Sequence, residues 1–245
     1  MRSFVFAVLV AVMAAAPAMA AEQKQVPAQA PAPAPAAPGA PAVEGEKAAL
    51  PEMDKLMAYV GTPKYFKAVA FVALGGERDI TPQCKEPKAL GRAGFTVLEM
   101  PSFKDGVAHP VSGLWKDQIL VDRCGPKVLH NVLVEGAADG THVRGLLMPG
   151  DTGAPWDWQG DILKDVMVEA MKASGCKDSN KVVVVNTKAD AMIEPITPDK
   201  QGRIVSGKWR EIWTLRACDK PQPVAVTFVA DGKGRAKTEV KAEKK

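Results

Sequence analysis

VSGLWKDQILVDRC at residues 111–124 and VSGKWREIWTLRAC at residues 205–218 are two copies of one pattern. A Val-Ser-Gly start, a tryptophan, an acidic residue and a final cysteine keep the same spacing in both stretches, at an offset of 94 residues (205 − 111). Similarity at a fixed offset is typical of a duplicated structural unit. The repeat therefore predicts an α+β fold made by tandem duplication, with one unit at residues 51–150 and the other at 151–240.

The second unit shows the pattern of its elements most clearly. Apolar residues recur at helical spacing from Asp161, a candidate N-cap, to Gly175, a candidate stop. Four β-rich runs follow, and turn residues separate them. We expect one helix packed on a four-stranded antiparallel sheet, whose strands lie at residues 181–186, 205–218, 223–230 and 237–240.

The first unit follows the same plan with less regular edges. Residues 64–74 form the expected helix, which Gly75 and Gly76 should end. A further helical turn over residues 54–60 would belong to neither copy. The expected strands are residues 95–100, 111–124, 128–135 and 141–148.

The four cysteines divide equally between the two units. Four cysteines allow three pairings. The repeat favours Cys84 with Cys124 and Cys176 with Cys218, because a unit must have satisfied its own thiols before it was duplicated. The bridges would close loops of 40 (124 − 84) and 42 (218 − 176) residues. Each should stabilise the fold by about 4 kcal/mol in the chain-entropy account, less any strain.

The first fifty residues predict an exported protein, periplasmic or secreted. Residues 1–20 carry an early arginine, an apolar run and a small-x-small end, which are the parts of a signal peptide. Residues 21–50 are rich in proline and alanine and predict a disordered arm. The run at residues 4–16 is shorter than a bilayer requires, so we expect no transmembrane anchor. An even number of cysteines also fits an oxidising compartment.

Charge and motif content exclude several classes of function. The formal net charge of +4 falls to +3 once the signal, with its single arginine, is removed, and this balance gives no support to nucleic-acid binding. Residues 241–245 are a short basic tail. No cofactor motif is found. His130 and His142 lie on neighbouring expected strands and could meet, yet no carboxylate or cysteine stands at ligand spacing, so no metal site is predicted.

Two acidic residues share the apolar faces of the repeated strands. Alternation places Asp117 beside Trp115, and Glu211 between Trp209 and Trp213. Burial disfavours the charged form of a carboxyl group, so such residues could act as proton donors. The alternative is structural: each acid lies where its strand leaves the core, and it pairs with a neighbouring basic residue. Duplication favours this alternative, because a unit seldom keeps two working sites.

The connector between the units carries two further candidate features. Trp156 and Trp158 could stack on a sugar or grip a peptide, or they could fill the junction between the units. Residues 151–153, Asp-Thr-Gly, match the triplet of aspartic proteases, but no second triplet occurs to share a proton. We assign no catalytic residue, and the candidate ligand-binding residues are Trp156, Trp158, Asp117 and Glu211.

The segment from Gly207 to Gly234 resembles uncharacterised secreted or periplasmic proteobacterial proteins. The resemblance rests on a Trp-x-Glu-x-Trp, Cys, Val-x-Phe and Asp-Gly pattern, and it covers the last third of the chain. The first copy departs from it, with Ile119 in place of the second tryptophan and Asp117 in place of glutamate. The resemblance implies an exported disulfide-bearing domain and supplies no catalytic residues.

Taken together, these features predict a non-catalytic envelope protein. We expect a binding or scaffolding module whose partner is an unidentified envelope protein or cell-wall component. The alternative is a hydrolase or ligand-handling enzyme with a site between the units, near Trp156, Trp158 and the two acids. A third function, inhibition or chaperoning of an exported protein, rests on fold analogy, because a helix wrapped by an antiparallel sheet is similar in shape to cystatins.

Overall fold

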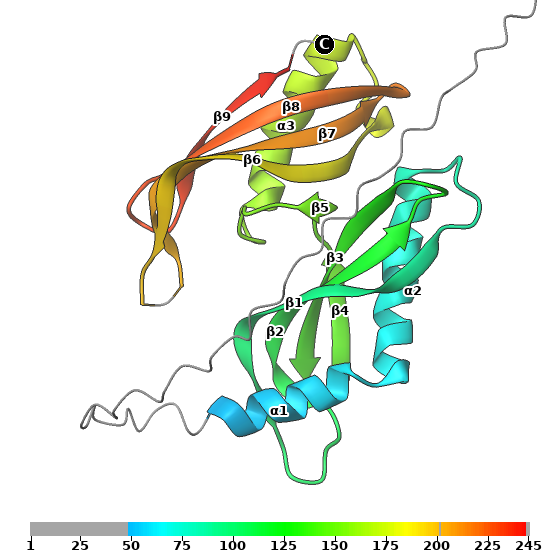
Figure 1. Cartoon of the computed structure of the whole chain (residues 1–245), viewed down its shortest axis with the longest axis vertical. Coiled ribbons are helices and arrows are strands. Elements are labelled where there is room, and N and C mark those ends of the chain that lie inside the picture. Colours follow the sequence, from blue (N-terminus) through cyan, green and yellow to red (C-terminus); the bar gives the residue numbers. More distant parts are fainter. Residues whose placement is uncertain (1–48, 201, 244–245) are drawn as a thin grey trace, which may run out of the picture. The chain divides into compact units, whose positions relative to one another are not determined.

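The structure is a computed structural model that describes residues 49–200 and 202–243. The predicted signal peptide, nearly all of the predicted arm and the last two residues lie outside these ranges. The described residues form an α+β fold with two sheets and three α-helices (Figure 1). Two disulfides are also present. Among the helices described, none is long and apolar enough to cross a membrane.

The first module, residues 49–146, joins two helices to an antiparallel sheet of order β1-β2-β3-β4. The single helix predicted for each unit is wrong here, because Leu56 and Val60 of the first helix are buried in the same core as Trp115 and Ile119. The extra helix is therefore part of the fold. The elements are α1 (Ala49–Val60), α2 (Pro63–Ile80), β1 (Lys88–Phe103), β2 (Pro110–Asp122), β3 (Lys127–Ala137) and β4 (Gly140–Leu146).

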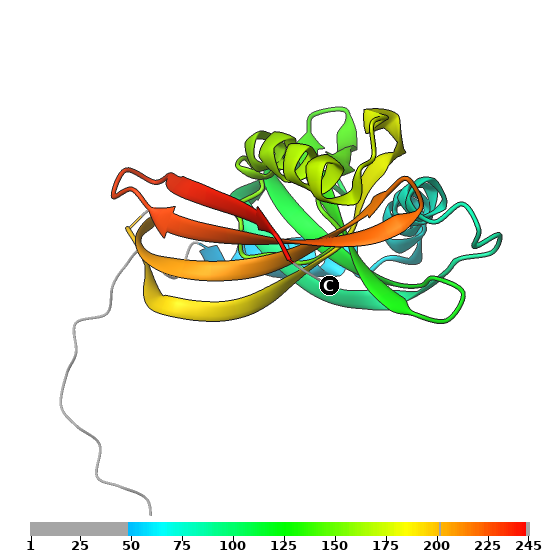
Figure 2. The same cartoon turned by 90° about the horizontal axis from the view of Figure 1, so that it is seen from above.

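The second module, residues 150–242, has one α-helix, which lies across one face of its sheet (Figure 2). The sheet has the order β5-β6-β7-β8-β9 and is mixed, since the short β5 pairs parallel to β6. The predicted sheet of four antiparallel strands lacked β5, which is two residues long and has no strand pattern. The elements are β5 (Gly150–Asp151), α3 (Gln159–Ser174), the 3₁₀ turn η1 (Ser179–Lys181), β6 (Val182–Pro198), β7 (Ile204–Ala217), β8 (Lys220–Ala230) and β9 (Ala236–Ala242).

Two predicted helix boundaries are wrong. The helix α2 continues through Gly75 and Gly76 to Ile80, because Glu77 in its last turns is fully buried and bonded to the sheet. Asp161 lies within the first turn of α3 and is not its N-cap. The predicted stop at Gly175 is confirmed: its φ of 73° is the left-handed conformation that glycine adopts readily.

The strand faces follow the predicted alternation. Trp115, Ile119 and Val121 of β2 are fully buried, as are Trp213 and Leu215 of β7. The strands β1 and β6 are much longer than expected. Part of β6, from Lys188 to Pro195, is an exposed ribbon with no buried face. Such a segment carries no apolar alternation for a sequence pattern to detect.

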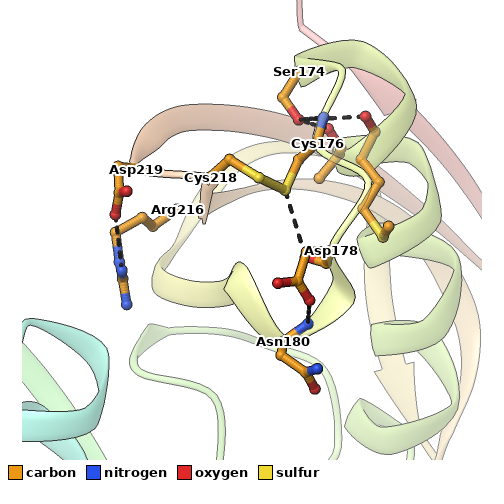
Figure 3. Close-up of a disulfide and its surroundings, with 9 residues drawn as sticks. Ser174, Cys176, Asp178, Asn180, Arg216, Cys218 and Asp219 are labelled. Atoms are coloured by element: carbon orange, nitrogen blue, oxygen red, sulfur yellow. Dashed lines mark hydrogen bonds and ion pairs between the residues drawn. A yellow bond between two sulfur atoms is a disulfide. The ribbon is translucent and has the colours of Figure 1, made fainter.

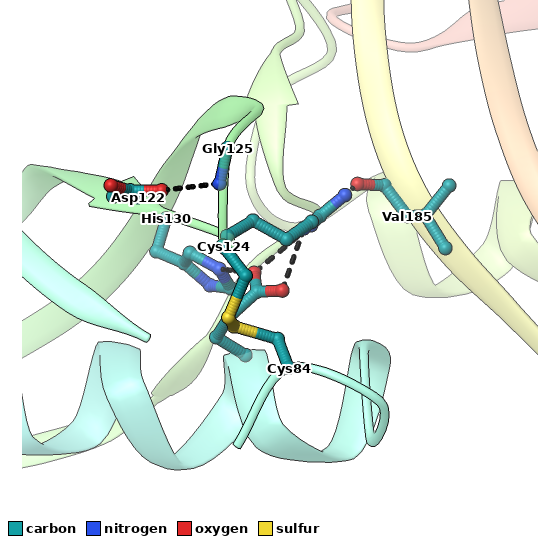
Figure 4. A network of polar contacts seen from close by, with 8 residues as sticks. Cys84, Asp122, Cys124, Gly125, His130 and Val185 are labelled. Atoms are coloured by element: carbon teal, nitrogen blue, oxygen red, sulfur yellow. Dashed lines mark hydrogen bonds and ion pairs between the residues drawn. A yellow bond between two sulfur atoms is a disulfide. The ribbon is translucent and has the colours of Figure 1, made fainter. Parts of the chain in front are cut away.

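The predicted disulfide pairing is present in the structure. Cys176 bonds Cys218 (Figure 3) and Cys84 bonds Cys124 (Figure 4). The Cα atoms of the two pairs lie 5.5 and 5.6 Å apart, respectively. Each bridge ties the segment after a helix to the hairpin that follows the repeated strand. Cys124 and Cys218 open two-residue turns in which both residues have positive φ, as primed hairpin turns require.

Candidate functional site

Asp117 is a fully buried anion with a bidentate partner. Nε and one terminal nitrogen of Arg92 donate to its two oxygens at 2.8 and 2.9 Å, and the same guanidinium donates to the Val60 carbonyl. The Tyr65 hydroxyl accepts the indole proton of Trp115 at 2.8 Å. Burial and the nearby charge of Asp117 raise the pKa of Tyr65. Asp117 is thus neutralised inside the core and is not directed at solvent.

Glu211 is also fully buried, but its four hydrogen-bond donors are all uncharged. Its Oε1 accepts the Trp209 indole proton at 3.0 Å and the Gly153 amide proton at 2.9 Å. Its Oε2 accepts from the Trp213 indole at 2.9 Å and from the Thr152 hydroxyl at 2.6 Å. All four partners donate, so both oxygens of the Glu211 side chain are engaged as acceptors inside the core.

The Asp-Thr-Gly triplet belongs to this Glu211 cradle. The Thr152 hydroxyl accepts the Ala154 amide proton at 3.0 Å, so its own proton is directed to Glu211. Gly153 supplies a backbone N–H. Thr152 and Gly153, two of the three residues that spell the protease triplet, therefore fasten the connector to β7.

A third buried acid, Glu77, was missed by the sequence reasoning. Arg123 donates to both of its oxygens at 2.6 and 3.0 Å, and His130 Nε2 donates at 2.7 Å. Burial alone would raise the pKa of Glu77, but hydrogen bonds from His130 and Arg123 lower it to about 2. One signal for its burial was available in the sequence: Glu77 lies four residues after Ala73, on the same apolar stripe of α2.

The four predicted ligand-binding residues do not meet in one exposed site. Trp158 is 5% exposed in the second core, whereas Trp156 is 38% exposed. Asp117 and Glu211 are each enclosed in the core of a different module. His130 and His142, which could have met across the hairpin, have separate partners: His130 binds Glu77 and His142 binds the exposed Asp139.

The connector is held by hydrogen bonds from both modules. The Asn131 amide donates to the carbonyls of Met148 and Gly150 at 2.6 and 2.9 Å, and Thr187 donates to Pro149. Arg123 adds a bond to the Val185 carbonyl of β6 at 2.9 Å (Figure 4). These polar groups at the junction therefore have a structural role.

An open pocket lies elsewhere, between the N-terminal half of α2 and the β3–β4 hairpin. Its volume is about 580 Å³, within the range of small-molecule sites. A second hollow of about 440 Å³ adjoins it, and the two share Tyr59 and Ala108. The larger one, which we call the α2–β4 pocket, is lined by Tyr59, Thr62, Lys64, Tyr65, Ala68, Val69, Ala108, His109, Val134, Asp139, Gly140, Thr141 and Val143.

The lining of the α2–β4 pocket is apolar at its floor and polar at its mouth. Val69 and Val134 are each 1% exposed and form part of the floor. At the mouth, the Tyr59 and Thr141 hydroxyls share a hydrogen bond of 2.6 Å. A floor without polar groups and a rim that has them are typical of sites that bind small amphiphilic molecules.

The second module has a smaller and more polar hollow at the corresponding place. It measures about 270 Å³, lies between the start of α3 and β9, and is bordered by Asp161, Asp165 and Arg235. Arg235 lies 3.9 Å from Asp161 across it. The two modules therefore differ in the size and polarity of the hollow at this position.

No cluster of three or more histidine, cysteine or acidic side chains able to hold a metal occurs in residues 49–200 and 202–243. No protein-family model, curated protein or solved structure matches the chain, so the resemblance noted from the sequence stays a prediction.

Proposed function

We propose that the protein is a non-catalytic exported binding module whose ligand occupies the α2–β4 pocket. One observation carries the proposal: the buried acids of both cores are already bonded to internal donors, while the apolar pocket beside Val69 and Val134 is open. Catalysis requires a proton donor or nucleophile that can reach a substrate. Binding requires a concave apolar surface with a polar rim, which this pocket supplies.

Export is supported by the two disulfides, which persist in oxidising compartments. We infer that the mature chain starts at Ala21. Amino-terminal sequencing of the protein from its native cells should find this start. A chain that begins at Met1 would contradict the inference.

We also propose that the two modules arose by duplication. Register shifts of the β1–β2 and β6–β7 pairings recur 95 residues apart, at Glu99 and Glu194 and at Ser102 and Thr197. Buried helix positions recur 93 residues apart, as in Val69 and Ile162. An experimental structure in which these bulges fail to coincide after superposition of the modules would count against common origin.

Binding can be tested with the neutral fluorescent probe N-phenyl-1-naphthylamine. Ala68 is exposed and lines the pocket, so Ala68→Phe should fill the pocket without disturbing the core. Ala173→Phe is the matched control, because Ala173 is an exposed alanine on α3. We expect saturable binding of one probe per chain, lost in Ala68→Phe and kept in Ala173→Phe.

Two results would contradict the proposal. One is the absence of saturable binding, or binding that Ala68→Phe leaves intact. The other is turnover of ester or cell-wall substrates that Asp117→Asn or Glu211→Gln abolishes while circular dichroism shows a folded variant.

A further inference from the structure

We propose that the ligand of the α2–β4 pocket is a small amphiphilic monocarboxylate, whose apolar body lies on the valine floor and whose carboxylate pairs with Lys64. This inference rests on the proposed function and adds the chemical class of the ligand. It follows from which polar groups around the pocket are already engaged and which are not.

Most polar side chains of the lining have partners within the protein. The hydroxyls of Tyr59 and Thr141 bind each other. The Thr62 hydroxyl donates to the Tyr59 carbonyl and accepts the Tyr65 amide proton, which caps α2. The Tyr65 hydroxyl accepts from Trp115. These groups hold the pocket in shape and offer little to a ligand.

The charged groups at the mouth differ in whether they already have a partner. Asp139 accepts a hydrogen bond of 2.8 Å from His142, which lowers the pKa of Asp139 and engages one oxygen of its carboxylate. Among the described residues, Lys64 lies at the mouth with no ion pair or hydrogen bond of its own. His109 directs Nδ1 at the Pro110 carbonyl at 3.1 Å, so the neutral ring carries its proton there and leaves Nε2 without one. Lys64 is therefore the charged donor free to meet a ligand.

The charge and polarity of the pocket favour one class of ligand over others. The single ammonium of Lys64 balances the one charge of a carboxylate, whereas a doubly charged phosphate would keep a second negative charge without a partner at the mouth. A sugar would leave hydroxyl groups unpaired against Val69, Val134 and Val143, at a cost in desolvation. A chain or ring that carries one carboxylate satisfies both the floor and the rim.

The test uses displacement of N-phenyl-1-naphthylamine by decanoate and by decanol, which share the same chain length and differ in charge. Both are used below their aggregation limits at neutral pH. We expect decanoate to bind about five-fold more tightly than decanol, which is the upper range for one solvent-accessible ion pair. Lys64→Gln should remove this preference. Lys67→Gln is the control, because Lys67 is exposed on the same helix and does not line the pocket.

The outcomes separate the two proposals. Equal affinity of decanoate and decanol for the wild type overturns the monocarboxylate inference while the pocket remains a binding site. A preference for decanoate that persists in Lys64→Gln also overturns it. If the probe itself fails to bind, the proposed function fails as well.

Discussion

Asp117 and Glu211 occupy the same position of β2 and β7, two residues after a buried tryptophan, yet they are held by different partners. Asp117 pairs with the guanidinium of Arg92, whereas Glu211 accepts only neutral donors. The longer glutamate reaches the Trp209 indole directly. In the first module, the corresponding indole of Trp115 donates to Tyr65. One position thus keeps a buried carboxylate in both modules, with different neighbours to satisfy it.

Glu211→Gln should destabilise the protein, although the glutamine side chain has nearly the same size and shape as glutamate. The amide would turn its own N–H groups towards two of the four donors that the carboxylate accepts, and buried donors left unpaired cost about 1–3 kcal/mol. We expect a loss of about 2 kcal/mol in the free energy of unfolding, measured by urea denaturation. Glu239→Gln, at an exposed position of β9, should be neutral. Equal stability of the two variants would show that the cradle is not structural.

Acidification should weaken the Glu77 network. The pKa of Glu77 is lowered from 4.5 to about 2 in the folded protein, so the unfolded chain takes up the proton first. The stabilisation is then complete above about pH 5 and is lost as the pH falls towards 2. At neutral pH, Glu77→Gln should cost about 3 kcal/mol, because it breaks a buried charge pair.

The measurement is urea unfolding of the wild type and Glu77→Gln from pH 7 to pH 3. The difference between the two should shrink towards acid pH. Glu86→Gln, which changes an exposed residue, provides the comparison. A difference that stays constant over this range would contradict the assigned protonation of Glu77.

The positive φ of Cys218 predicts which replacement of this cysteine gives the more stable protein. Cys218 has a φ of 47°, a conformation that costs an L-residue about 1 kcal/mol and costs glycine little. In a Cys176→Ala background, Cys218→Gly should therefore be more stable than Cys218→Ala by about 1 kcal/mol. Thermal unfolding of both double variants checks this. The reverse order would indicate that the turn relaxes once the disulfide is absent.

Gly75 and Gly76 should respond differently to the same substitution. A Cβ at Gly75 meets open space, so Gly75→Ala should stabilise α2 by about 1 kcal/mol. A Cβ at Gly76 would collide with Leu146 Cδ1. Gly76→Ala should therefore gain less than Gly75→Ala, or lose stability. Equal gains would mean that Leu146 moves aside without cost.

The sequence was informative where one face of an element is buried and the other is not. The tryptophan and valine alternation of β2 and β7 predicted their buried faces, and the repeat predicted the pairing of Cys84 with Cys124. Long-range polar contacts left no such pattern. The continuation of α2 past Gly76 depends on Glu77, Arg123 and His130, which meet only in the folded chain.

The candidate site was predicted poorly for a related reason. Trp158 and Glu211 carry chemistry that draws attention in a sequence, but packing encloses both of them. More than half of the residues that line the α2–β4 pocket are valines, alanines and tyrosines, from segments far apart in the chain. Residues of these types are common in any core, so only the tertiary arrangement distinguishes a floor from an interior.

The most direct test of the account is an amide NMR titration of the protein with N-phenyl-1-naphthylamine. The α2–β4 pocket predicts saturable shift changes at Ala68, Val69, Val134 and Thr141, with the second module unaffected. Changes centred instead on Ile162 and Arg235, or changes that never saturate, would contradict it.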